Sequence, residues 1–136
     1  MKQILKFPYT KIAKTAPFRP ILPITVINEH DQNKSMVFPC ILDTGADFCL
    51  LPEAVCGFLG HKLADGLCKS EMTGIGGIEK GYLHSNLIVV ANKTIKCDFF
   101  ICENWTAQIG LLGHKGFFDK FQVFFDTPRK YFVLFQ

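Results

Sequence analysis

Short runs of apolar and β-branched residues recur along the whole chain, separated by glycine, proline and polar clusters. Such runs are typical of β-strands bounded by turns. Two of them, ILPITVIN and MVFPCIL, predict single strands at 21–28 and 36–42. Further runs predict three hairpins at 69–90, 87–102 and 122–135. Because the apolar pattern fits strands almost throughout, we expect an all-β protein.

Helical patterns are few and short. A first short helix is expected after Pro52, since proline is tolerated at a helix start, and Gly60 would end it. A second is expected around 116–121, within the segment HKGFFDKF. The polar segment 29–35 (EHDQNKS) reads as a turn region between two strands. Many short strands with one or two short helices predict a small closed β-barrel or a sandwich.

The chain length suits one domain. It has 136 residues, of which 49% are apolar and 14 are phenylalanine, enough to build a packed core. We detect no linker, repeat or low-complexity segment, so the domain is expected to span 1–136. Residues 1–20 would form an additional N-terminal strand or an arm.

Charge and hydropathy narrow the possible partners. The net charge is only +3, without a block of consecutive basic residues, so a nucleic-acid partner is not expected. The longest aliphatic run, LIVVA at 87–91, is too short to span a bilayer. The segment 1–14 lacks the continuous apolar core of a signal peptide. We therefore expect a cytoplasmic protein without a membrane partner.

The six cysteines have two possible interpretations. Their spacing contains no Cys-x-x-Cys pair and no zinc-like Cys and His arrangement. Reduced thiols buried as small apolar residues fit a chain without a secretion signal. A redox or metal protein built on these cysteines is the less favoured alternative. We expect no metal and no organic cofactor.

The triplet Asp43-Thr44-Gly45 interrupts an apolar stretch, PCILDTGADFCLLPE. Such a triplet can be a simple turn, in which the aspartate caps its own backbone. Surface turns are usually flanked by polar residues, however, and here 40–42 and 48–51 are apolar. An ionisable carboxylate in an apolar setting is costly unless it is paired or used. The pattern favours a loop that holds a carboxylate rigidly, with Gly45 allowing close approach.

Three segments together resemble the retropepsin-like aspartic proteases, the family that includes retroviral proteases. They are ILDTGADFCLLP at 41–52, the glycine-rich TGIGGIEKG at 73–81, and IGLLGHKGFFDKFQVFFD at 109–126. They occur in the order that the family has, and the resemblance covers most of 20–136. It implies a small closed β-barrel with one or two short helices, and a homodimeric endopeptidase acting on a peptide or protein.

The resemblance also assigns roles to individual residues. Asp43 would be the catalytic acid. Because one Asp-Thr-Gly supplies one carboxyl and the reaction needs two, a pair of chains would each donate Asp43. Thr44, Gly45 and Ala46 would support the active-site loop. The flap over the substrate would contain Thr73, Gly74, Ile75, Gly76, Gly77 and Ile78.

One position departs from the family pattern. The family often has arginine after the Leu-Gly pair, where it pairs with the aspartate that follows Asp-Thr-Gly-Ala, beside the subunit boundary. The resemblance therefore assigns support of the dimer interface to Asp47, Gly113 and His114. Here Asp47 is present, but Gly113 is followed by His114. Histidine can pair with Asp47 when protonated, yet it lacks the bidentate fork of arginine. This departure keeps open an alternative function, a catalytically silent dimerising or peptide-binding module with the same fold.

Overall fold

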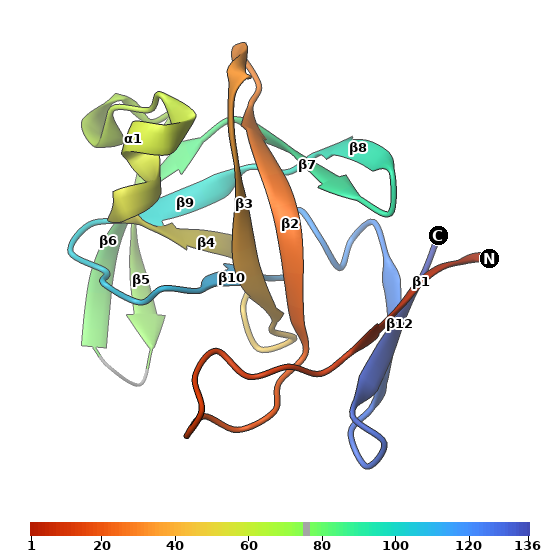
Figure 1. The fold of residues 1–136 in the computed structure, drawn as a ribbon. Coiled ribbons are helices and arrows are strands. Elements are labelled where there is room, and N and C mark those ends of the chain that lie inside the picture. Colours follow the sequence, from red (N-terminus) through yellow and green to blue (C-terminus); the bar gives the residue numbers. More distant parts are fainter. Residues whose placement is uncertain (75–76) are drawn as a thin grey trace.

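A computed structural model describes residues 1–74 and 77–136, and these residues form an all-β structure, as predicted (Figure 1). The short helical elements are η1 (Glu53–Val55), α1 (Cys56–Leu59) and η2 (Leu63–Asp65). None of the described helices is long or apolar enough to cross a membrane. The strands are β1 (Gln3–Pro8), β2 (Ile21–Asn28), β3 (Asp31–Leu42), β4 (Cys49–Pro52), β5 (Lys69–Gly74), β6 (Gly77–His84), β7 (Asn86–Val90), β8 (Lys93–Lys96), β9 (Phe99–Cys102), β10 (Gly110–Leu112), β11 (Gln122–Asp126) and β12 (Tyr131–Phe135).

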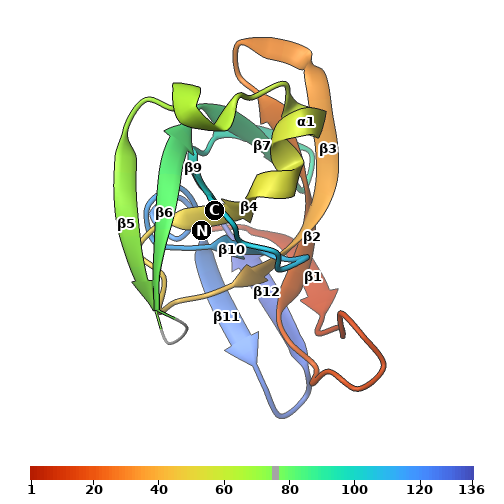
Figure 2. The ribbon, with the colours of Figure 1, turned by 90° about the vertical axis from the view of Figure 1, so that its left-hand side faces the viewer.

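The strands form two open sheets. Nine of them are hydrogen-bonded in the order β5-β6-β9-β4-β10-β3-β2-β7-β8, and β1-β12-β11 form a separate three-stranded sheet. The larger sheet curls strongly, so that its two ends face different sides of the molecule (Figures 1 and 2). The expected closure of the barrel is not found among the described strands, because β5 and β8 each have a single neighbour.

Within the N-terminal segment 1–20, residues Gln3–Pro8 form the strand β1. β1 pairs antiparallel with β12, from Gln3↔Phe135 to Pro8↔Tyr131. After β1, Thr10 and Arg19 form an isolated antiparallel bridge, which closes residues 11–18 into a loop. The hairpin β11–β12 was predicted correctly, with its turn between Asp126 and Tyr131.

The segment 29–35 differs from its prediction as a turn. β2 begins and ends where the pattern placed it, but β3 already begins at Asp31, and the turn is confined to Glu29 and His30. Residues 31–35 are exposed because this end of the β2–β3 hairpin projects beyond the body of the protein (Figure 1). A strand that extends into solvent needs no apolar face, and its polar sequence therefore resembled a loop.

One of the two expected helices is present. η1 and α1 follow Pro52, and Gly60 ends α1 in the left-handed conformation with φ of 67°. The segment 116–121 forms consecutive turns instead of a helix. Gly116 has φ of 114°, which no helix accepts, and Asp119 N–H bonds to the His114 carbonyl over five residues. η2 was not predicted.

The core lies between the curled sheet and the three-stranded sheet. Phenylalanine supplies its largest fully buried side chains, Phe99, Phe117 and Phe132. Phe132 comes from β12, so the smaller sheet packs its inner face against the same core. This arrangement holds the loop after β3 against a rigid base.

Candidate active site

The loop that contains Asp43 is held by a strand from far along the chain. β3 leads into the loop and β4 leaves it, and β10 lies between these two strands. β10 runs parallel to β3, with Leu112 opposite Leu42, and antiparallel to β4, with Leu111 opposite Leu50. The loop 43–48 therefore arches over the end of β10. The structure thus brings together the segments 41–52 and 109–126, two of the three that carry the family resemblance.

Asp43 is fixed by its own backbone and by the glycine two residues on. Its N–H donates to the Leu112 carbonyl at 2.9 Å, and its carbonyl accepts the Ala46 N–H at 3.1 Å. Its Oδ1 accepts the Gly45 N–H at 2.9 Å. A Cβ at Gly45 would lie 3.2 Å from this Oδ1, so glycine leaves the carboxylate uncrowded. The carboxylate is half-buried and held in one orientation, while Thr44 and Gly45 are exposed.

Gly113 is the point at which the loop rests on β10. A Cβ built there would lie 2.3 Å from the Phe48 carbonyl oxygen and 2.6 Å from that of Ala46. Real Cβ atoms do not approach backbone so closely. On the C-terminal side of Gly113, the His114 N–H donates to the Ala46 carbonyl and the Lys115 N–H donates to that of Asp47, both at 2.9 Å. Only glycine allows this contact.

His114 contacts a different residue from the one we expected. Its Nε2 lies 2.6 Å from the Thr44 carbonyl oxygen, and its ring packs beside Phe118 with centroids 5.4 Å apart. Within the described chain, no ion pair joins His114 to Asp47. Asp47 is tied to this segment by its backbone carbonyl instead. His114 therefore supports the Asp-Thr-Gly loop directly.

An apolar row leads away from Asp43 across one face of the sheet. Leu50, Leu111, Ile41 and Ile21 are successive cross-strand partners on β4, β10, β3 and β2. Partners in register share one face, and alternation along β3 places Asp43 on the same face as Ile41. The first three of these side chains are half-buried, whereas their neighbours toward the core are fully covered. An extended apolar surface therefore adjoins the carboxylate.

Of the residues that the resemblance assigns to a flap, those that the structure describes lie on the hairpin β5–β6. Thr73 pairs with Ile78 and Gly74 with Gly77, and the Ile78 side chain is 65% exposed. Ile75 and Gly76, which we also assigned to the flap, lie outside the described residues. The hairpin runs toward the same end of the molecule as the loop 43–48 (Figures 1 and 2).

A pair of thiols beneath the loop was not singled out from the sequence. Cys49 and Cys97 are fully buried, with their sulfur atoms 3.7 Å apart. The Gly113 N–H also donates to the Cys49 sulfur, at 3.4 Å. Hydrogen bonding from Cys97, reinforced by this N–H, lowers the pKa of the Cys49 thiol, and the same contact together with burial raises that of Cys97. All six cysteines are free thiols.

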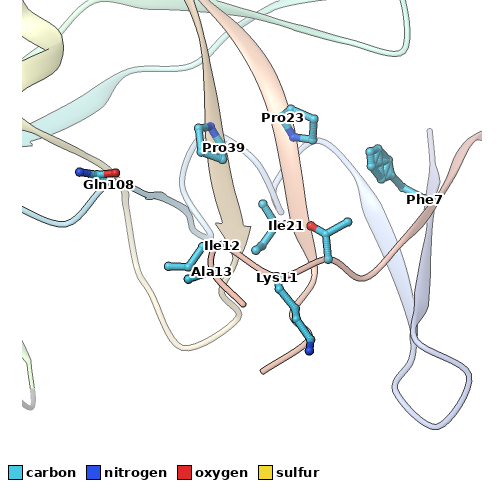
Figure 3. Close-up of a pocket in the computed structure, with 9 residues that line it drawn as sticks. Phe7, Lys11, Ile12, Ala13, Ile21, Pro23, Pro39 and Gln108 are labelled. Atoms are coloured by element: carbon cyan, nitrogen blue, oxygen red, sulfur yellow. The ribbon is translucent and has the colours of Figure 1, made fainter. Parts of the chain in front are cut away.

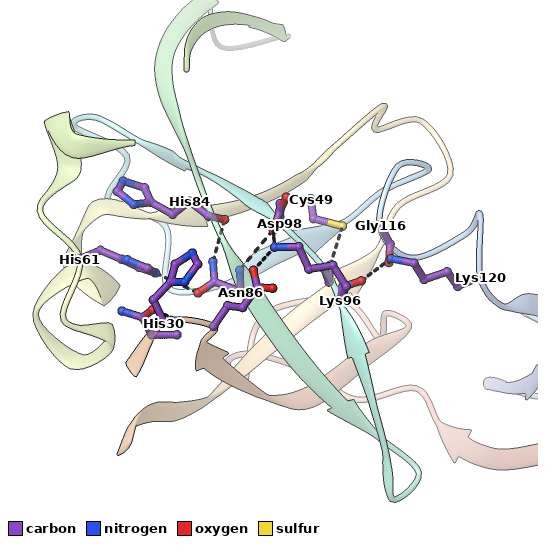
Figure 4. A network of polar contacts seen from close by, with 12 residues as sticks. His30, Cys49, His61, His84, Asn86, Lys96, Asp98, Gly116 and Lys120 are labelled. Atoms are coloured by element: carbon purple, nitrogen blue, oxygen red, sulfur yellow. Dashed lines mark hydrogen bonds and ion pairs between the residues drawn. The ribbon is translucent and has the colours of Figure 1, made fainter. Parts of the chain in front are cut away.

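A pair of neighbouring histidines, with His84 buried and His61 half-buried, forms part of a network of polar contacts (Figure 4). The rings of His61 and His84 are 4.4 Å apart, and His61 Nε2 lies 2.9 Å from the Asn86 Oδ1. Burial lowers the pKa of His84 and the neighbouring His61 adds to this, although the Leu63 carbonyl at 3.0 Å and Asp65 oppose it. The sequence offered no signal for this network, because its members come from separate segments.

Comparisons with known proteins identify the fold. No protein-family model matches the chain, and neither does any curated protein sequence. Among solved structures, a retropepsin-like aspartic protease from Rickettsia conorii matches with a TM-score of 0.67 and 16% identity, over 98% of this chain and 99% of that one. EIAV protease complexed with the inhibitor HBY-793 matches with a TM-score of 0.52 and 21% identity, over 76% and 88% of the two chains.

The protein is therefore an all-β protein with the fold of aspartic proteases. More narrowly, its fold is retropepsin-like, as the sequence resemblance implied.

Proposed function

We propose that the protein is an aspartic endopeptidase whose active site forms when two copies each contribute Asp43. The observation that carries the proposal is the way in which the Asp43 carboxylate is held. Asp43 lies on a loop clasped by β10, its Oδ1 is oriented by the Gly45 N–H at 2.9 Å, and an apolar row adjoins it. A loop built only as a turn would not need a strand inserted between its two flanking strands.

The proposed chemistry follows from two carboxyls that share one proton. At close range both cannot ionise together, so one is a carboxylate and the other a carboxylic acid. The carboxylate takes a proton from a water molecule, whose oxygen attacks the peptide carbonyl carbon. The carboxylic acid gives its proton to the carbonyl oxygen. In the tetrahedral intermediate, the carboxyl that took a proton from water gives it to the nitrogen, and the C–N bond breaks to release an amine. The other carboxylate takes a proton from a hydroxyl of the intermediate, which leaves a carboxylic acid product and restores the pair with one shared proton.

Other residues of the loop would assist this chemistry by position. Thr44 is exposed beside Asp43, where its hydroxyl can bond across a two-fold axis to the partner loop. Gly45 is also exposed and would present its backbone carbonyl to a peptide. The β5–β6 hairpin would cover the substrate and exclude water. The apolar row favours peptides with apolar side chains near the cleaved bond.

The decisive experiment replaces the acid while keeping its shape. Asp43→Asn retains an oxygen that can accept the Gly45 N–H, so we expect the fold to persist and peptide hydrolysis to fall by at least about a thousandfold. Hydrolysis of a casein or peptide-library substrate by both proteins would measure the effect, with circular dichroism as the check on folding. An Asp43→Asn variant that cleaves at the wild-type rate would rule out Asp43 as the catalytic group.

A dilution series would test the shared site. Activity per chain should fall as the dimer dissociates, because each chain holds one Asp43. Analytical ultracentrifugation over the same concentrations would give the dimer population. Full specific activity in a strictly monomeric sample would refute the two-chain mechanism. A folded dimer that binds peptides without cleaving them would instead support the silent peptide-binding module.

A further inference from the structure

A pocket of about 640 Å³ lies between the N-terminal segment and the sheet beside it (Figure 3). We call it the arm pocket. The N-terminal segment supplies one wall and strands β2 and β3 supply the floor, while Gln108 stands at the opposite side. Its apolar lining consists of Phe7, Ile12, Ala13, Ile21, Pro23 and Pro39.

The wall of the arm pocket is anchored at both ends. Thr10 and Arg19 exchange two backbone hydrogen bonds, of 3.0 and 2.8 Å, which close the loop between them. Just before this loop, the Tyr9 N–H donates to the Lys130 carbonyl at 2.8 Å. Within the loop, the Ala16 N–H donates to the Ala13 carbonyl at 3.0 Å. The pocket is thus preformed between fixed backbone segments.

The arm pocket continues the apolar row that begins at Asp43. Ile21 belongs to both, and Pro23 pairs with Pro39 in the next register position along β2 and β3. Pro39 and Ile41 share one face of β3, and Asp43 follows in the same alternation directly after the strand ends at Leu42. At about 3.3 Å per residue, Ile41 lies about 7 Å and Pro39 about 13 Å along the strand from Asp43. An extended peptide covers the same distances in two to four residues.

We propose that the arm pocket is a side-chain binding site of the protease, and that it takes a bulky apolar residue two to four positions from the cleaved bond. This proposal rests on the proposed function, because it places the peptide backbone at Asp43. Phenylalanine fits the chemistry of the site, since six of the nine lining residues are apolar and the one charged residue among them, Lys11, is exposed to solvent. Ile12, 56% exposed without a ligand, would gain cover from such a side chain.

The test begins with peptides that the wild-type protein cleaves, found by digesting a peptide library. From one cleaved sequence, paired peptides carry phenylalanine or glycine at the second, third or fourth position from the bond. We expect kcat/KM to favour phenylalanine by at least about tenfold at one of these positions. Ala13→Trp fills the pocket and should reduce this ratio below about threefold. Ala64→Trp, an equal change at an exposed position in η2, should leave the ratio at its wild-type value.

Gln108→Trp narrows the pocket from its other side and replaces Ala13→Trp if that variant does not fold. If the wild type hydrolyses phenylalanine and glycine peptides with nearly equal kcat/KM, the arm pocket is not a side-chain binding site, and the protease function stands. The same conclusion follows if neither pocket variant changes the ratio of these two values. A probe independent of catalysis is N-acetyl-phenylalaninamide, with N-acetylglycinamide as its control. The phenylalanine compound should shift the backbone NMR signals of Ile12, Ala13 and Ile21 more than the glycine compound does. Such shifts without any hydrolysis would overturn the protease function alone, and the absence of both would overturn the two proposals together.

Discussion

Gly113→Ala is the substitution that most directly tests how the Asp43 loop is held. The added methyl group would lie 2.3 Å from the Phe48 carbonyl oxygen and 2.6 Å from that of Ala46. Both atoms are backbone, so neither can rotate away as a side chain would. The loop 43–48 must therefore move off β10, or β10 must move within the sheet.

The size of the effect follows from the contacts that such a movement breaks. Overpacking in a rigid site costs about 1–3 kcal/mol. Two backbone hydrogen bonds next to Gly113, from His114 N–H to Ala46 and from Lys115 N–H to Asp47, add about 0.5–1.5 kcal/mol each when they are lost. We expect the free energy of unfolding to fall by about 2–6 kcal/mol, a large share of the stability of an ordinary domain.

Gly57→Ala is the matched control. Gly57 lies in α1, where an added Cβ meets no atom within 4 Å, so alanine should stabilise the protein by about 0.4–1 kcal/mol through its lower unfolded-state entropy. Urea denaturation followed by circular dichroism, at one fixed protein concentration, would compare the two variants with the wild type. A Gly113→Ala protein within about 0.5 kcal/mol of the wild type would refute this account of the loop. The same variant should also lose hydrolysis, since the carboxylate would leave its place.

Two further predictions concern the buried polar residues. Burial lowers the pKa of His84 in the folded state, so the unfolded chain binds the proton more readily, and stability should fall as pH drops below about 6.5. His84→Gln should reduce this loss of stability. Equal slopes of unfolding free energy against pH in the variant and the wild type would show that His84 is not its cause. Asn28 is buried, and its Nδ2 donates to the Leu59 carbonyl at 2.8 Å, so Asn28→Ala should cost about 1–3 kcal/mol in urea denaturation. The exposed Asn33→Ala should stay within about 0.5 kcal/mol, and an equal cost at both positions would show that the buried hydrogen bond is not the cause.

Local sequence determined most of the strands and the identity of the candidate site. The apolar run at 21–28 is long enough to specify β2 by itself, and its bounds were predicted as they are found. Gly60 ends α1 because only a residue without a Cβ easily takes its left-handed conformation. The Asp-Thr-Gly triplet stood out because a carboxylate among apolar residues needs a reason. In each case the signal lies within a few neighbouring residues.

The tertiary structure decided what depends on distant partners. The pattern in 29–35 suggested a turn, because a strand without a buried face has no apolar alternation to reveal it. The helix expected at 116–121 gave way to turns, because Gly116 takes a φ of 114° with Cys97 and Cys49 packed against it. Likewise, the insertion of β10 between β3 and β4 and the arm pocket bring together segments that are far apart in sequence. Contacts of this kind are fixed by packing between strands, which no local pattern of residues records.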